Sequence, residues 1–320
     1  MHILIISTED VWVDDNKLSG IFQVHQALAL KEKKIEVNLL SPSVLSLSQL
    51  RKAVKYTYRI QELDAEGVKI VKYRKINFKA GSEIGYLKTW VSSGIFLYKH
   101  YERKYGRPDL IHAHNYIFAG ILAKEIYEKY AIPYVVTEHS SQYVNNKDIS
   151  PYLRNKVIDT YNNSLKNIFV SQFLQKNFYS KLNVKTSNQD QVLYNTLAPE
   201  FGVKDLSKKA KDFTFLNVAS LIPVKNQISL ITAFSNVFRG DDSIKLSIVG
   251  DGILREDLRK LVSNLGISKQ VNFEGKLTTK EIADHMKRAH VFILSSVKET
   301  FGVVVIEALS MGLPVLASNC

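Results

Sequence analysis

Short apolar runs rich in β-forming residues alternate with longer stretches of helical pattern along most of this chain. Such alternation is typical of βα units built around a parallel sheet. In the first half the expected strands carry the sequences HILIIST, IEVNLLS, GVKIVKYR, DLIHAH, PYVVTEH, NIFVS and QVLYN. Helical patterns between them include residues 20–31, 83–105 and 117–130. We therefore expect an α/β fold.

The stretch TLAPEFGVKDLSKKAKD, residues 196–212, interrupts this alternation with polar and basic residues, and its composition predicts an interdomain linker. After it, the strands FTFLNVAS, KLSIVGDG, VNFEGK, VFILSS and PVLAS are expected, with helices between them. We therefore predict two Rossmann-like, doubly wound domains, residues 1–195 and 213–320. Ligands of such folds bind beyond the carboxyl ends of the strands, which predicts a site in a cleft between two facing domains.

The last expected strand, PVLAS, has the apolar composition of a central strand, and the sequence ends two residues after it. A doubly wound domain normally continues into a helix that covers its sheet. We therefore expect the second domain to be incomplete at its C-terminus.

The bulk composition, with 45% hydrophobic and 23% charged residues among 320, is typical of a soluble globular protein. No apolar run approaches the roughly 20 residues that span a bilayer. The opening HILIIST lacks a basic leader and predicts a strand rather than a signal peptide. Cys320 is the single cysteine, so no intrachain disulfide can form, and a cytoplasmic location is expected.

Most of the formal charge of +12 is concentrated between Arg51 and Arg107, where 14 Lys and Arg stand against 5 Asp and Glu, a net of +9. Ten Tyr, Phe and Trp residues are interleaved with these charges. A basic, aromatic surface suits phosphorylated substrates or an anionic membrane. A solvated face over ordinary core aromatics would give the same composition. No nucleic-acid motif accompanies it, and no nucleic-acid partner is expected.

The stretch KETFGVVVIEALSMG, residues 298–312, combines a β-branched run with two glutamates, Glu299 and Glu307. A strand here would run directly into the next strand and leave no room for a crossover. We therefore predict a helix that begins at Thr300 or Phe301 and ends at the Gly-Leu-Pro that follows. Its buried positions are expected to be Val304, Ile306, Ala308, Leu309 and Met311.

This helix would offer an anion site at its start, because its first N–H groups carry the positive end of the helix dipole. Gly302 would let a ligand approach that backbone closely. Glu299 and Glu307 would be about 12 Å apart along the axis, too far for the carboxyl pair of a glycosidase. We therefore expect them to bind different parts of one elongated ligand, although two solvated glutamates flanking a core helix would look the same.

Four blocks of the second half carry a family resemblance: LNVASLIPVKNQISLITAF, LSIVGDGILREDL, VNFEGKLTTKEIADHM and SSVKETFGVVVIEALSMGLPVLAS. In this order they resemble the GT-B glycosyltransferases of family 4, whose E-x7-E motif matches Glu299 and Glu307. The resemblance covers nearly the whole chain, weakly in the first half and strongly from about residue 190. It implies the GT-B fold, with two Rossmann-like domains facing across a cleft.

The resemblance further implies a retaining, metal-independent transferase of the hexosyltransferase type that needs no cofactor. Its donor would be a nucleotide-sugar, of the UDP or GDP type. Glu299 would contact the hydroxyls of the transferred sugar and Glu307 the ribose of the nucleotide. Lys225 would neutralise the departing diphosphate, a role that needs a cation where no metal provides one.

The remaining donor contacts implied by the resemblance are backbone groups and small residues. The amides of Thr300, Phe301, Gly302 and Val303 would hold the sugar and diphosphate. Ser220 stands where the family commonly has an arginine. Of the two positive charges expected to bind the diphosphate, only Lys225 then remains, unless another residue such as Arg255 supplies the second. Gly250 opens a G-x-G that could approach the phosphates or simply form a tight turn after a strand.

In the first half, Gly20 in KLSGIF resembles the glycine loop that the family places near the donor phosphates and the acceptor. Ser19 replaces one glycine of the usual pair. His139 matches a strand-end histidine that faces the reacting sugar, where it could bind a hydroxyl or assist proton movement. His112 and His114 form an H-x-H, but without a carboxylate or cysteine partner pattern we expect no metal site.

Together these features predict transfer of a sugar to a glycan or lipid-linked acceptor in cell-envelope polysaccharide synthesis. The protein would be cytoplasmic and in peripheral contact with the anionic inner face of the membrane. A non-catalytic nucleotide-sugar-binding partner and a GT-B nucleotide-sugar epimerase are the alternatives. An epimerase would isomerise its donor without an acceptor, and a binding partner would bind without turnover.

Overall fold

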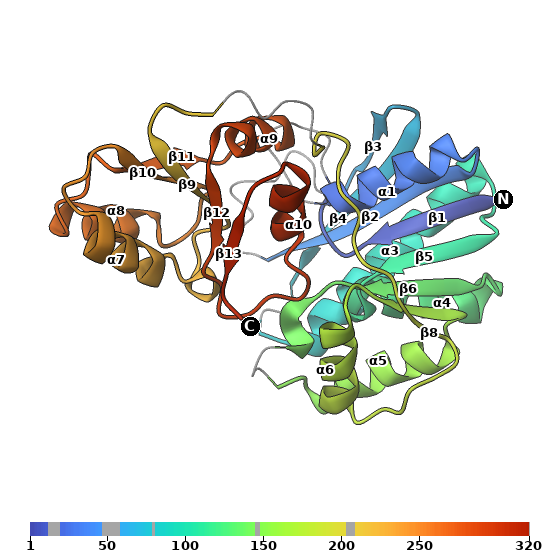
Figure 1. The fold of residues 1–320 in the computed structure, drawn as a ribbon. Coiled ribbons are helices and arrows are strands. Elements are labelled where there is room, and N and C mark those ends of the chain that lie inside the picture. Colours follow the sequence, from blue (N-terminus) through green and yellow to red (C-terminus); the bar gives the residue numbers. More distant parts are fainter. Residues whose placement is uncertain (12–19, 47–57, 79–80, 145–147, 203–208, 320) are drawn as a thin grey trace. The chain divides into compact units, whose positions relative to one another are not determined.

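The computed structural model describes residues 1–11, 20–46, 58–78, 81–144, 148–202 and 209–319 (Figure 1). The chain divides into two compact units, Met1–Tyr194 and Asn195–Cys320. Ser19 and the stretch 51–57 of the basic region lie outside the described residues.

The first unit is built on an eight-stranded sheet with the order β3-β4-β2-β1-β5-β6-β7-β8. Its strands are β1 (His2–Ser7), β2 (Glu36–Ser46), β3 (Ile60–Ala65), β4 (Val68–Asn77), β5 (Leu110–His114), β6 (Tyr134–Glu138), β7 (Lys166–Phe169) and β8 (Asp190–Val192). The seven expected strands are present and pair in parallel. The sequence did not predict β3, whose polar IQELDA forms the edge of the sheet by pairing antiparallel to β4.

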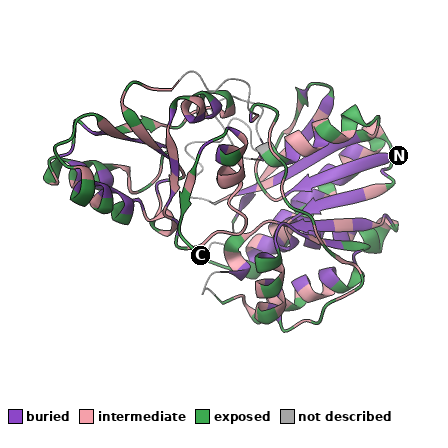
Figure 2. Cartoon of the chain, viewed as in Figure 1, coloured by how far each residue is buried: buried purple, intermediate pink, exposed green. Residues whose placement is uncertain are grey.

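Helices cover both faces of this sheet, because alternate side chains of its strands are buried on opposite sides. The helices are α1 (Ile21–Glu32), α3 (Glu83–Tyr105), α4 (Ile121–Tyr130), α5 (Pro151–Asn163) and α6 (Gln172–Leu182). On β4, Ile70 belongs to the core that includes α1 residues, while Tyr73 packs against Phe96 of α3, with ring centroids 4.6 Å apart. The six residues of β1 are all buried at the centre (Figure 2).

The helix predicted for residues 117–130 begins later, at Ile121. Before it, a π-helical turn (Tyr116–Gly120) contains two residues with non-helical backbone angles, Ile117 at ψ 128° and Phe118 at φ +74°. These angles are incompatible with a continuous α-helix. The chain therefore bends at the carboxyl end of β5, next to the polar side chains of His114 and His139.

The second unit contains a parallel five-stranded sheet with the order β11-β10-β9-β12-β13. Its strands are β9 (Phe213–Val218), β10 (Ile244–Val249), β11 (Val271–Gly275), β12 (Val291–Leu294) and β13 (Val315–Ala317). Its helices are α7 (Gln227–Phe238), α8 (Arg255–Asn264), α9 (Thr279–Arg288) and α10 (Val303–Ser310). Leu246 and Ile248 of β10 pack with α7 and α8, whereas Phe292 and Leu294 of β12 pack with α9 and α10. Both units are therefore Rossmann-like, doubly wound α/β structures, as the sequence predicts.

Three expectations for the end of the chain are wrong in detail. The strand β13 is not central but forms the edge of the described sheet, and Leu316 is 57% exposed. Helix α10 begins at Val303 rather than at Thr300 or Phe301, because Gly302 adopts φ +74° and cannot continue a helix. Leu309 is exposed, since it lies on the side of α10 away from buried Ala308.

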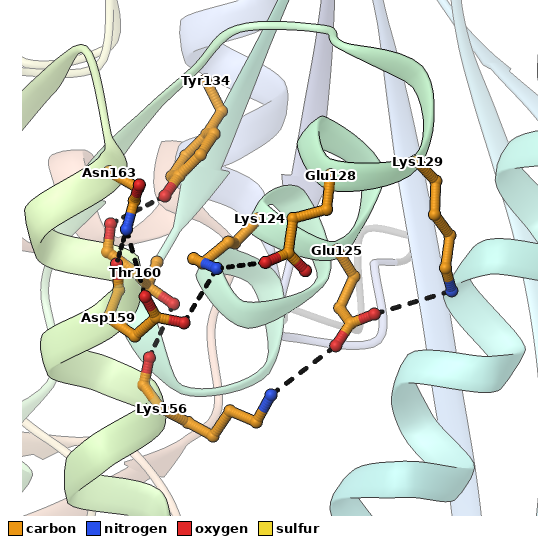
Figure 3. A network of polar contacts seen from close by, with 9 residues as sticks. All are labelled: Lys124, Glu125, Glu128, Lys129, Tyr134, Lys156, Asp159, Thr160 and Asn163. Carbon is orange, nitrogen blue, oxygen red and sulfur yellow. Dashed lines mark hydrogen bonds and ion pairs between the residues drawn. The ribbon is translucent and has the colours of Figure 1, made fainter.

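A charged network joins α4 to α5 on the first unit (Figure 3). The buried Lys124 Nζ lies 2.5 Å from Glu128 Oε1 and 2.8 Å from Asp159 Oδ2. Within the described ranges, no helix combines the length and apolar character needed to cross a bilayer.

Candidate functional site

Glu299 and Lys225, which come from different loops of the second unit, form an ion pair. Lys225 Nζ donates to Glu299 Oε1 at 2.5 Å, and Ser296 Oγ donates to the same oxygen at 2.7 Å. Both charged side chains are mostly buried, with 22% of the Lys225 side chain and 18% of the Glu299 side chain exposed. Two of the predicted residues are therefore brought into direct contact. Ser296 was missed, although its position at the end of VFILSS was a signal.

The two loops are held together because β9 and β12 are neighbouring parallel strands, whose carboxyl ends lie at the same edge of the sheet. Val297 N donates to Val224 O at 2.8 Å, and Ser295 Oγ donates to Lys225 O at 2.9 Å. Lys225 itself ends a short 3₁₀ turn (Pro223–Lys225). Backbone bonds, rather than the ion pair alone, thus position the Lys225 side chain.

Gly302 forms the N-cap of α10, directly after the loop that carries Glu299. A Cβ built on Gly302 would come no closer than 3.7 Å to Val305, so glycine is needed for the backbone angle rather than for space. Thr300, Phe301 and Val303 are half-buried around this turn. The first amides of the helix therefore lie close in sequence and space to the Lys225–Glu299 pair, which suits an anionic ligand.

Glu307 lies in the middle of α10, and burial raises the pKa of its carboxyl to about 7. In the part of the chain that the structure describes, no hydrogen bond to this carboxyl is found. A carboxyl that has lost water without gaining protein partners is suited to accept hydrogen bonds from ligand hydroxyls.

Gly250 and Ser220 lie in touching loops at the carboxyl ends of β10 and β9. Gly250 adopts φ +133°, and a Cβ added to it would lie 2.0 Å from Ala219 O. Leu221 N donates to Asp251 O at 3.0 Å, which holds the two loops together. Ser220 is exposed, and Arg255 Nη1 lies 3.3 Å from Asp251. Close backbone packing accounts for a glycine at position 250 whether or not it touches a ligand.

Gly20 is the N-cap of α1 in the first unit and adopts φ +74°. Its N–H donates to Glu9 Oε2 at 2.7 Å, and an added Cβ would lie 2.6 Å from Val11 Cγ2. Both the backbone angle and the lack of space therefore require glycine here.

His139 follows β6, and its ring lies edge to edge with that of His114 of β5, with the ring planes 5° apart. His114 Nδ1 and His139 Nε2 are 3.0 Å apart. Burial lowers the pKa of His139 to about 4, so the ring is neutral at pH 7. His112 does not compete for these nitrogens, because its Nε2 lies 2.7 Å from Thr137 Oγ1.

Glu138, which sequence reasoning missed, supports this corner of the first unit. It is fully buried and accepts hydrogen bonds from the backbone N–H groups of Tyr116 at 2.9 Å and Ser140 at 2.6 Å. Burial raises the pKa of its carboxyl to about 7. The available signal was a carboxylate at the end of an apolar strand, immediately before His139.

Among the described residues no group of three or more His, Cys, Asp and Glu side chains is arranged to hold a metal ion. The second unit offers a lysine, a helix N-terminus and the carboxyl of Glu299 at the carboxyl ends of its strands, and a second carboxyl, that of Glu307, in the middle of α10. A cation and backbone amides stabilise an anionic leaving group, and carboxyls bind hydroxyl groups.

Comparison with known proteins agrees with this arrangement. Residues 23–195 match the family described as Glycosyltransferase Family 4, and residues 200–320 match Glycosyl transferases group 1. Alpha-monoglucosyldiacylglycerol synthase of Streptococcus pneumoniae is 34% identical over 121 residues, which are 38% of this chain and 26% of that protein. The GDP-mannose-dependent alpha-(1-6)-phosphatidylinositol monomannoside mannosyltransferase of Mycobacterium tuberculosis is 35% identical over 113 residues, 33% of this chain and 29% of the relative. These matches thus span less than a third of either relative.

Solved structures of similar fold include sucrose-phosphate synthase from Thermosynechococcus elongatus, with a TM-score of 0.74 and 18% identity. It is matched over 100% of this chain and 82% of its own. HepE of Anabaena in complex with UDP has a TM-score of 0.71 at 18% identity, over 100% and 81% of the two chains. The fold is thus GT-B, and because the first family match alone covers more than half of the sequence, this protein belongs to glycosyltransferase family 4.

Proposed function

We propose that this protein is a retaining, metal-independent glycosyltransferase that moves a sugar from a nucleotide-sugar to a glycan or lipid-linked acceptor in cell-envelope polysaccharide synthesis. The observation that carries the proposal is the contact of Lys225 with Glu299 immediately before α10, the helix that also carries Glu307. A lysine, helix amides and two carboxyls match the phosphate, sugar and ribose of such a donor.

In the proposed reaction the bond between the sugar's anomeric carbon and the phosphate oxygen breaks, and the diphosphate leaves with the bonding electrons. Lys225 and the first amides of α10 stabilise its charge. Glu299 accepts hydrogen bonds from the sugar hydroxyls, and Glu307 from the ribose. The acceptor hydroxyl attacks from the same face and passes its proton to the departing phosphate oxygen, which retains the configuration without a covalent intermediate. In the first unit, His139 is proposed to bind a sugar hydroxyl and Gly20 to lie near a phosphate or the acceptor.

The nucleotide is proposed to be of the UDP or GDP type, with no cofactor. The name of the mycobacterial relative includes GDP-mannose, and the Anabaena structure contains UDP. Both support a donor that carries a nucleoside diphosphate.

Calorimetric titration with UDP, GDP and ADP tests the donor site. We expect one nucleotide to bind selectively, and binding to weaken at least about tenfold in Lys225→Ala and Glu307→Gln, since each change removes a hydrogen-bonding group worth roughly 1.4 kcal/mol. Lys260→Ala and Glu256→Gln are matched controls, because both side chains are exposed on α8. Binding of none of the nucleotides, or equal binding by all four variants, would contradict the proposal.

The acceptor is proposed to be held at an anionic membrane surface, at the cytoplasmic face, by the exposed basic residues of α3. Lys88, Lys99 and Arg103 are exposed along this helix, at positions that place them with Phe96 on one line. Phe96 is 47% exposed, and Phe78, shortly before the helix, is 68% exposed. Each cation near an anionic membrane contributes about 1 kcal/mol of attraction, and the exposed ring of Phe78 can enter the interface. The names of both relatives contain a lipid, a diacylglycerol and a phosphatidylinositol, which supports this proposal.

Co-sedimentation with vesicles of phosphatidylcholine and phosphatidylglycerol tests this surface. We expect the wild type to sediment with anionic vesicles and the triple variant Lys88→Glu, Lys99→Glu, Arg103→Glu to remain in solution. Lys176→Glu, Lys185→Glu, Lys260→Glu has the same charge change at exposed positions elsewhere. If both triple variants lose binding equally, net charge rather than α3 is responsible, and the assignment to α3 is wrong.

A further inference from the structure

The carboxyl ends of β5 and β6 are joined by an unusually complete set of polar contacts. Asn115, which adopts φ +74°, donates its N–H to Thr137 O at 2.8 Å and accepts from His139 N at 3.0 Å through Oδ1. Glu138 binds the N–H of Tyr116 from the same side of the corner. The backbone at both strand ends is thus held in place, and the hydrogen-bonded rings of His114 and His139 have little freedom to move apart.

The hydrogen bond between these two rings contains one proton, which belongs to one ring or the other. His114 Nδ1 lies 3.0 Å from His139 Nε2, so one of the two nitrogens donates and the other accepts. Burial lowers the pKa of both imidazoles, that of His139 to about 4 and that of His114 well below its ordinary value. Both rings are therefore neutral at pH 7, and each carries a single N–H.

The second ring nitrogen of His114 indicates which of the two rings donates the hydrogen bond. Its Nε2 is buried and has no hydrogen-bond partner among the described residues. If His139 donated, His114 would carry its own proton on this isolated nitrogen. Buried donors without a partner are rarer in folded proteins than buried acceptors without one. The arrangement with less cost is therefore His114 Nδ1–H donating to His139 Nε2.

We propose that His114 is a positioning residue that fixes His139 as the Nδ1–H tautomer, so that His139 offers a hydrogen-bond donor, not a base, to a bound ligand. The side chain of His139 is half-buried, and no partner for its Nδ1 is found in the described ranges. The ligand it suits is an electron-rich oxygen, such as a sugar hydroxyl acting as acceptor or a phosphate oxygen.

The consequence for catalysis rests on the proposed glycosyl transfer. A neutral His139 whose Nε2 is already occupied cannot take a proton from the attacking hydroxyl through that nitrogen, and its Nδ1 is already protonated. It can only donate a hydrogen bond that orients the sugar or stabilises developing negative charge. Of the two roles that the sequence left open for this residue, hydrogen bonding is retained and proton abstraction is excluded.

Two variants of His114 distinguish the effect of its hydrogen-bond donor from the effect of its aromatic ring. In His114→Asn the side-chain amide nitrogen occupies roughly the place of Nδ1 and still donates. In His114→Phe an aromatic ring is kept and the donor is lost. The tautomer is read from two-bond ¹H–¹⁵N correlation spectra of the ¹⁵N-labelled full chain at pH 7, with the His139 signals assigned by their loss in His139→Gln. Thermal unfolding of each variant shows that it is folded.

We expect His139 to carry its proton on Nδ1 in the wild type and in His114→Asn, and to shift towards Nε2–H in His114→Phe. An Nε2–H tautomer or an imidazolium in the wild type would overturn the proposal, and that spectrum needs no variant to fold. An unchanged Nδ1–H tautomer in His114→Phe would also overturn it, because His114 would then not be the cause.

Activity provides the second measurement. In His114→Phe we expect kcat of sugar transfer to fall about tenfold, with KM for the donor changed less than about twofold, and His114→Asn to restore kcat. Absence of transfer by the wild type would contradict the proposed function, while the spectra would still decide the tautomer.

Discussion

Lys225 and Glu299 neutralise each other across two loops, with their charged atoms 2.5 Å apart and a hydroxyl of Ser296 on the same carboxylate oxygen. Under the proposed function both groups have other partners in the reaction, the diphosphate for the lysine and the sugar for the glutamate. The ion pair therefore keeps two buried charges compensated until a ligand with both features replaces it.

We expect this pair to contribute a coupling free energy of about 1 kcal/mol to stability, because both side chains are mostly buried. The measurement is a double-mutant cycle of Lys225→Ala and Glu299→Ala in urea unfolding. The control is the pair Lys69 and Asp64, 2.5 Å apart, whose side chains are 45% and 47% exposed, and it should show coupling near zero. Equal coupling in both pairs would mean that the loops do not shield the first pair from water.

Glu307 should make the protein less stable as pH rises. Its folded-state pKa is about 7, above the ordinary 4.5, so the folded state binds the proton more tightly than the unfolded state. The free energy of unfolding contributed by this group therefore falls between about pH 4.5 and 7 and then levels off. Glu307→Gln should remove this slope and stabilise the protein at pH 8 by about 1–3 kcal/mol.

Denaturant unfolding of wild type and Glu307→Gln at pH 5 and pH 8 measures this effect. The difference between the two proteins is the informative quantity, because Glu138, with a pKa also raised to about 7, adds the same slope to both. Glu256→Gln on the exposed face of α8 should show no such difference. A stability gain independent of pH would point to packing instead.

Gly250→Ala should destabilise the second unit by about 3 kcal/mol or more. The new Cβ would lie 2.0 Å from Ala219 O, so the loop after β9 must move in addition to the cost of a positive φ. Gly240 is the matched control, since it has φ +91° and nothing within 4 Å of an added Cβ. Gly240→Ala should cost only about 1 kcal/mol. Similar losses in thermal unfolding would show that backbone angle alone matters at Gly250.

In the Lys124 network, removing the positive charge and removing the negative charges should change stability by different amounts (Figure 3). Lys124 is buried, whereas Glu128 and Asp159 are about half exposed. Lys124→Met should change stability by less than about 1 kcal/mol, because the carboxylates regain water. The double variant Glu128→Gln, Asp159→Asn should cost about 2 kcal/mol, because it leaves a buried charge without a carboxylate.

Urea unfolding at low and high salt measures the stability of the wild type, of Lys124→Met and of the double variant. Lys156→Met, which removes a longer 3.7 Å contact with Glu125, should have little effect and serves as the control. A larger loss in Lys124→Met than in the double variant would contradict the expected asymmetry.

The sequence by itself determined the features that depend on local pattern. Hydrophobic periodicity located the parallel strands to within a few residues at most of their ends, and it located the long helix Glu83–Tyr105 to the residue. The Gly-Leu-Pro after Met311 marked the end of α10, because helix termination is governed by nearby backbone preferences. The ordered motifs of the second half indicated the family, and those blocks are contiguous in sequence.

Only the tertiary structure decided which side chains meet. Lys225 and Glu299 are 74 residues apart, and His114 and His139 are 25 apart, and neither contact follows from local preference. The strand β3 was missed because its polar sequence becomes a strand only by pairing with β4. Glycine at position 250 is explained by the backbone of a neighbouring loop. Contacts, burial and the resulting pKa values arise from packing between distant segments, whereas a sequence pattern records only what each segment prefers alone.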